Sequence, residues 1–104
     1  MFTNQTDTTR DLLHSRIRLS DGLFFRPERS GDRVWYQIEH TGDQRFFRIG
    51  HAEYTFVSLL DGDTSPAEAI SLTARALGPD ALTEEQAVSI LMWLQDNSLA
   101  TGID

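Results

Sequence analysis

The spacing of apolar residues changes near residue 51, from alternation typical of strands to the periodicity of helices. Before that point, residues 33–39 alternate most regularly, with Val34, Tyr36 and Ile38 on one face. A strand repeats every two residues, so this pattern predicts a strand with one buried face. Residues 33–39 are therefore expected to be the central strand of a sheet.

Shorter stretches on either side also alternate. Residues 16–19 alternate charged and apolar side chains, and residues 23–26 predict a short strand that ends at Pro27. Residues 45–49 predict a further strand, the third of the sheet. The connections between these strands are short, which requires antiparallel pairing because parallel strands need long crossovers.

Helical signals fill the second half of the chain. An apolar stripe begins after His51 and is expected to end at the break formed by residues 61–62. Capping boxes at Ser65–Glu68 and Thr83–Gln86 each precede another apolar stripe. The last helix is expected to end near Asn97, a suitable C-cap.

Three strands followed by three helices predict an α+β domain. The sheet has to bury one face, and the helices are the cover available for it. We expect a winged-helix-like arrangement: a three-stranded antiparallel sheet followed by three helices, the last two of which resemble a helix-turn-helix. This domain is expected to span residues 16–104, after a flexible N-terminal tail over residues 1–15 that is polar and has no periodicity.

Composition narrows the classes of function. The 104 residues are enough for one small domain, and the absence of cysteine excludes disulfides and thiolate chemistry. No apolar run is long enough to span a membrane, and the N-terminus does not resemble a signal peptide, so we expect a cytoplasmic protein. Residues 1–48 carry a net charge of +1 and residues 49–104 one of −8. The overall charge of −7 argues against nucleic-acid binding.

The sequence contains no recognisable catalytic or metal-binding pattern. His14, His40 and His51 are scattered without metal-ligand spacing, no serine lies in a nucleophile motif, and glycine-rich phosphate loops are absent. We therefore expect neither catalysis nor a metal or cofactor, and look for function in a binding surface.

The strand over residues 45–49 offers one such surface. As the last strand of a meander it lies at a sheet edge, with backbone groups free to pair. Arg45 and Arg48 flank Phe46 and Phe47 there. Charged residues at an edge can simply protect it from aggregation, or the edge can bind a peptide as an added strand.

The last helix offers the second surface. On a helical wheel, Trp93 lies at the margin of the polar face, near Gln86 and Ser89. The indole can pack beneath a neighbouring segment, or it can anchor a ligand, since tryptophan is enriched in binding hot spots.

The order of these elements resembles the PqqD-like domain, the peptide-recognition element of ribosomal peptide biosynthesis. The resemblance covers about residues 16–100 and rests on a strand, an E-Y pair, an L-L-D-G sequence and a capped helix. These features occupy residues 41–49, 51–54, 59–62, 64–69 and 91–100. More narrowly, the chain resembles the N-terminal domain of peptide zinc metalloproteases of the site-2-protease type. It contains neither a metal motif nor a membrane span, so protease activity is not carried over.

The resemblance implies a non-catalytic module that binds a leader or substrate peptide between the third strand and the third helix. Such a module serves a larger peptide-processing or export protein, which can tether it to a membrane. The arginines of the strand favour an acidic peptide. Mapped onto this chain, the groove would use Arg45, Phe46 and Arg48 of the strand, and Gln86, Ser89, Ile90 and Trp93 of the helix.

Two other functions compete with peptide binding. The chain can be a structural docking domain, which contacts another part of a larger protein or forms a homodimer through the same edge. A DNA-binding winged helix is disfavoured, because the last helix carries Glu84, Glu85 and Asp96 and no basic residue.

Overall fold

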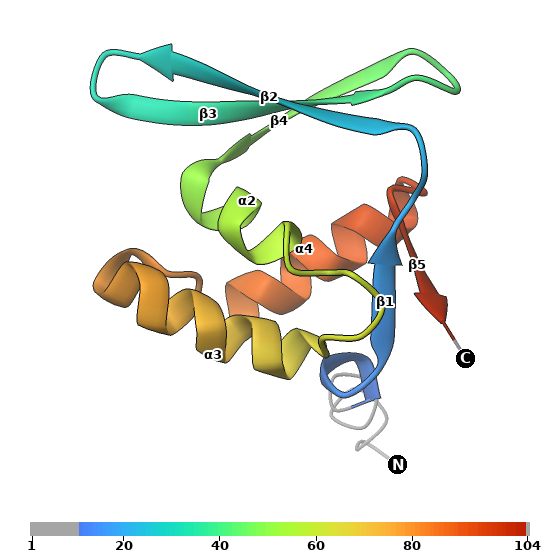
Figure 1. Cartoon of the computed structure of the whole chain (residues 1–104), viewed down its shortest axis with the longest axis vertical. Coiled ribbons are helices and arrows are strands. Elements are labelled where there is room, and N and C mark those ends of the chain that lie inside the picture. Colours follow the sequence, from blue (N-terminus) through green and yellow to red (C-terminus); the bar gives the residue numbers. More distant parts are fainter. Residues whose placement is uncertain (1–10, 104) are drawn as a thin grey trace.

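A three-stranded antiparallel sheet forms one layer of the protein (Figure 1). In the computed structural model, which describes residues 11–103, the strands are β2 (Leu23–Ser30), β3 (Arg33–His40) and β4 (Arg45–Gly50). They pair in the order β2-β3-β4, so β3 is central, as its regular alternation predicts. The expected three-stranded antiparallel sheet is thus confirmed.

Strand β2 does not end at Pro27 but continues to Ser30. Pro27 lies opposite Tyr36 of β3. Proline cannot donate a backbone hydrogen bond, but β2 is at the edge of the sheet, where a missing N–H leaves no partner unpaired. The prediction of a strand break was wrong because it ignored the position of the strand within the sheet.

Helices form the second layer, below the sheet in Figure 1. They are α2 (His51–Val57), α3 (Pro66–Leu77), the short 3₁₀ helix η1 (Gly78–Asp80) and α4 (Glu84–Asp96). Helix α2 contacts β3 and β4 as well as α3 and α4. It therefore joins the two layers, and the chain is an α+β domain as predicted.

Helix α2 is shorter than its apolar stripe suggests. The stripe reaches Leu60, but the helix ends at Val57, with Ser58 as its C-cap. Leu60 donates its N–H to the carbonyl oxygen of Val57 at 3.0 Å, a tighter turn than the α-helix makes. Leu60 remains buried, so the periodicity correctly identified a core residue but not the end of the helix.

The two predicted capping boxes differ in completeness. At α4, the hydroxyl of Thr83 accepts from the N–H of Gln86, and the side chain of Gln86 accepts in return from the N–H of Thr83. At α3, Ser65 accepts from the N–H of Glu68, without the return bond. Asn97 caps the end of α4, as expected.

The two ends of the described chain form a second, smaller sheet that the sequence analysis did not predict. Strand β1 (Arg16–Leu19) pairs antiparallel with β5 (Ala100–Ile103). The alternation of residues 16–19 was recognised, but the segment paired with it in the fold lies at the other end of the chain. Residues 1–10 of the expected tail, which was predicted over residues 1–15, lie outside the described residues. Residues 11–13 are helical, and Leu13 is buried.

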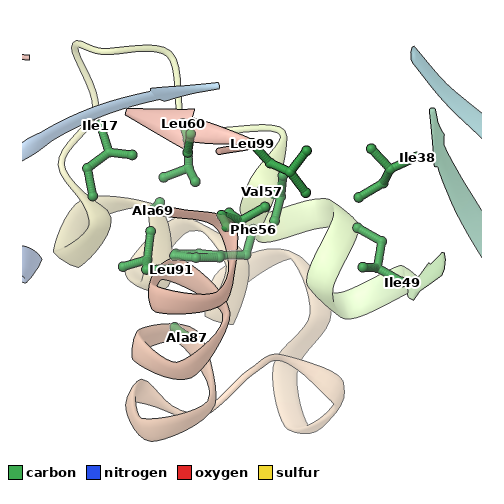
Figure 2. Close-up of a cluster of buried hydrophobic side chains, with 12 residues drawn as sticks. Ile17, Ile38, Ile49, Phe56, Val57, Leu60, Ala69, Ala87, Leu91 and Leu99 are labelled. Atoms are coloured by element: carbon green, nitrogen blue, oxygen red, sulfur yellow. The ribbon is translucent and has the colours of Figure 1, made fainter. Parts of the chain in front are cut away.

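The core fills the space between the helices and one face of the large sheet (Figure 2). Ile17 and Leu60 lie at one end of the labelled cluster, and Ile38 and Ile49 of the sheet at the other. Phe56 of α2 lies between them and is fully buried. No helix of the described residues covers the other face of the sheet (Figure 1). No helix among residues 11–103 is both long and apolar enough to cross a membrane.

Candidate functional site

Strand β4 has one edge without a partner. Within residues 11–103 it pairs with β3 alone, and its other side faces away from the sheet. Side chains alternate along it: Arg45, Phe47 and Ile49 are the more buried positions, whereas Phe46 and Arg48 are exposed. Backbone N–H and C=O groups along such an edge can pair with another extended chain.

A groove lies beside this edge, between the end of β4 and helix α4. Its volume is about 630 Å³. The residues that line it come from β4, from the first turn of α2, from the segment before α4 and from α4 itself. They are Arg48, Ile49, Glu53, Leu82, Glu85, Gln86, Ser89, Ile90 and Trp93.

Trp93 is a half-buried wall of the groove. Its ring meets that of Phe47 edge-on, with centroids 5.2 Å apart and planes at 89°. This is a favourable aromatic geometry and joins α4 to β4. The indole therefore packs against a neighbour, which was one of the two alternatives, and it also lines the groove. Its role as a ligand anchor stays a prediction.

Arg45 lies at the far end of α4, where it holds strand and helix together. Its Nη2 donates to the carbonyl oxygen of Asn97 at 2.7 Å, and its Nε lies 2.7 Å from a carboxylate oxygen of Asp43. The guanidinium also lies 5.4 Å from the ring centre of Phe47. Arg45 does not line the groove. Its contacts are structural and connect the start of β4 to the end of α4.

Phe46 and Arg48 point toward the open face of the sheet. Arg48 forms an ion pair with Glu28 at 3.3 Å and lies over the ring of Trp35. Phe46 is 56% exposed, and Phe24 on the same face is 57% exposed. The prediction placed Arg45, Phe46 and Arg48 in one groove. Strand alternation instead directs the side chain of Arg45 to one face of the sheet and those of Phe46 and Arg48 to the other.

The structure thus gathers five of the seven predicted residues around the groove, namely Arg48, Gln86, Ser89, Ile90 and Trp93. Arg48 lines the groove from β4, although its guanidinium reaches across the open face of the sheet to Glu28. The sequence analysis missed four lining residues, which are Ile49, Glu53, Leu82 and Glu85. Glu85 had a signal, because it lies one helical turn before Ser89. Glu53 had none, because only the fold brings the start of α2 next to α4.

The turn between β3 and β4 contains a small charge cluster. Asp43 contacts Nδ1 of His40 at 2.8 Å and Nε of Arg45 at 2.7 Å, through different carboxylate oxygens. The hydrogen bond with Arg45 is the main cause that lowers the pKa of Asp43 below its ordinary value of 3.8. The charged carboxylate of Asp43 therefore stabilises the position in which Arg45 contacts the end of α4.

This cluster predicts a specific acid sensitivity. A lowered folded-state pKa contributes stability that is present above pH 3.8 and is lost as the pH falls through the lowered value. We expect Asp43→Asn to be less stable than the wild type near neutral pH, with the difference shrinking in acid. Urea unfolding at a series of pH values measures it. Asp32→Asn, in the other hairpin turn, is the matched control, and an equal pH dependence of the two differences would contradict the assignment.

Among residues 11–103, no group of three or more histidine or acidic side chains is arranged to hold a metal ion. His51 lies 3.4 Å from the hydroxyl of Tyr36, with the two rings stacked.

No protein-family model matches the chain, and neither a curated protein nor a solved structure matches it.

Proposed function

We propose that this chain is a non-catalytic peptide-recognition domain, similar to PqqD-like domains, that binds an extended peptide as an additional strand on β4. The observation that carries the proposal is the unpaired edge of β4 beside the groove that Trp93 lines. The edge of β4 supplies backbone groups that can pair with a peptide, and the groove supplies a place for the side chains of that peptide. These are the two requirements of recognition by strand addition.

The fold supports this assignment by its order of elements. The sheet β2-β3-β4 is followed by α2, α3 and α4, and the groove lies between the last strand of that sheet and the last helix. We propose that this is a winged-helix-like arrangement of the PqqD-like type. The domain would then serve a larger peptide-processing or export protein on the cytoplasmic side.

Energetics require both parts of the site. Each backbone hydrogen bond contributes about 1 kcal/mol net, so a few of them barely offset the entropy lost when a peptide becomes ordered. Apolar side chains must supply the rest, at roughly 25 cal/mol per Å² removed from water. Leu82, Ile90 and Trp93 are the apolar groove residues available along the helix side. We expect about micromolar affinity, increased where the peptide is tethered to the same assembly.

Backbone methylation tests strand addition directly. Peptides are first selected from a random linear display library against the full chain. A strand that pairs on one side directs alternate N–H groups toward β4. Methylating those nitrogens should weaken binding by about fivefold for each bond lost, whereas methylating the intervening nitrogens should have little effect. Titration calorimetry measures both series.

Hydrogen exchange supplies the control and tests the competing function. Bound peptide should protect amides of β4, while the other edge, β2, should be unchanged because Pro27 interrupts its donors. Equal effects of the two methylation series, or protection of β2 alone, would contradict the proposal. If β4 becomes protected as the protein concentration rises without peptide, the edge docks a second copy and the domain is a dimerisation module.

A further inference from the structure

Both arginines assigned to the groove already have partners. Arg45 donates to the carbonyl oxygen of Asn97 at 2.7 Å, at the end of α4. Arg48 forms an ion pair with Glu28 at 3.3 Å, on the sheet face opposite the helices. Neither cation is therefore available, without breaking an existing contact, to meet a carboxylate of a peptide in the groove.

Two carboxylates line the groove instead. Glu53 comes from the first turn of α2 and Glu85 from the first turn of α4. No salt bridge found in the described part of the chain involves either of them. A Cβ placed on Gly50 would lie 2.5 Å from Oε1 of Glu53. The carboxylate of Glu53 thus folds over the last residue of β4, where the strand edge meets the groove.

The surroundings do not neutralise this pair. The amino ends of α2 and α4 each carry a partial positive charge of about half a unit, which is less than one carboxylate. Glu84 adds another negative charge in the first turn of α4, and that helix has no basic residue. Residues 49–104 contain nine acidic residues against the single arginine Arg75. Arg48 also lines the groove, but its guanidinium pairs with Glu28 across the open face of the sheet. The part of the groove that Glu53 and Glu85 line is therefore electronegative.

We propose that the groove selects a peptide carrying an arginine or lysine next to apolar residues. The cation lies beside Glu53 and Glu85, and the apolar side chains lie against Ile90 and Trp93. This inference rests on the proposed function and reverses the acidic preference that the two arginines suggested. Charges at the rim of an interface set selectivity and association rate more than affinity. The cation of the peptide therefore determines the selectivity of the groove, and the apolar contacts supply most of the affinity.

Competitive selection from the random linear library tests the inference, with the full chain as bait and the Trp93→Ala variant as counter-selection. We expect Trp93-dependent binders to be enriched in arginine or lysine at one position. Replacing that residue by glutamine in a synthetic peptide should weaken binding to the wild type by about two- to fivefold, as exposed charge pairs do. The loss should shrink at high salt, which screens exposed charges.

Two double variants locate the effect. In Glu53→Gln/Glu85→Gln, the basic peptide and its glutamine analogue should bind equally. In Glu68→Gln/Asp96→Asn, which changes the net charge by the same amount at residues outside the groove lining, the preference should remain. Trp93-dependent binders without a basic residue, or a preference that survives the first double variant, would overturn this inference and leave the proposed function standing. A library that yields no Trp93-dependent binder would overturn both.

Discussion

Phe56→Ala is expected to be strongly destabilising. Phe56 is fully buried and is the largest of the side chains without solvent exposure. Truncating a buried phenylalanine costs about 3–5 kcal/mol, the sum of lost transfer free energy and of the cavity left behind. Small domains have only about 5–15 kcal/mol of stability, so this single change removes a large share of it.

The position of Phe56 explains why collapse of the surroundings cannot compensate. It lies on α2, the short helix that contacts β3 and β4 on one side and α3 and α4 on the other. A void there loosens the contact between the two layers rather than one local turn. The groove also depends on this junction, because the separation of β4 from α4 sets its width.

Urea unfolding followed by circular dichroism measures the effect, with Phe46→Ala as the matched control. The same atoms are removed there from a side chain that is 56% exposed, and surface changes of this kind stay within about 0.5 kcal/mol. Similar losses of the free energy of unfolding in both variants would show that burial at Phe56 does not hold the two layers together.

Residue patterns alone predicted the parts of this fold that depend on local rules. The alternation of Val34, Tyr36 and Ile38 identified the central strand, and the capping box at Thr83 identified the start of α4. In both cases neighbours along the chain determine the structure: a period of two places one face toward the core, and a hydroxyl satisfies an unpaired N–H.

Sequence patterns failed to predict the structure where it depends on contacts between segments that are distant along the chain. The pairing of β1 with β5 joins residues at opposite ends of the described chain, and no local signal announces it. Pro27 was misjudged for a related reason, since its tolerance depends on β2 being an edge strand. At the groove, Gln86, Ser89 and Trp93 followed from the helical wheel, whereas Glu53 is brought there by packing between elements.

Trp93→Ala is expected to weaken peptide binding by about thirtyfold or more while the chain stays folded. The indole lines the groove and is the largest side chain among its lining residues. Buried aromatic anchors of this kind contribute 2 kcal/mol or more to binding, which corresponds to a loss of about thirtyfold or greater in affinity. From an expected Kd of about micromolar, the Kd of the variant rises to tens of micromolar or more, which titration calorimetry measures.

Two further variants separate binding from stability. Met92→Ala changes the preceding residue, which is 52% exposed and does not line the groove, and should leave both properties unchanged. Trp93→Phe preserves an aromatic partner for Phe47 and should restore the stability lost in Trp93→Ala, yet only part of the affinity, because a phenyl ring covers less of a peptide than an indole does. If Trp93→Ala binds the selected peptides as tightly as the wild type, the groove is not where they bind. An extended chain on β4 would then have to be held by its backbone alone, which the small net energy of each hydrogen bond does not allow.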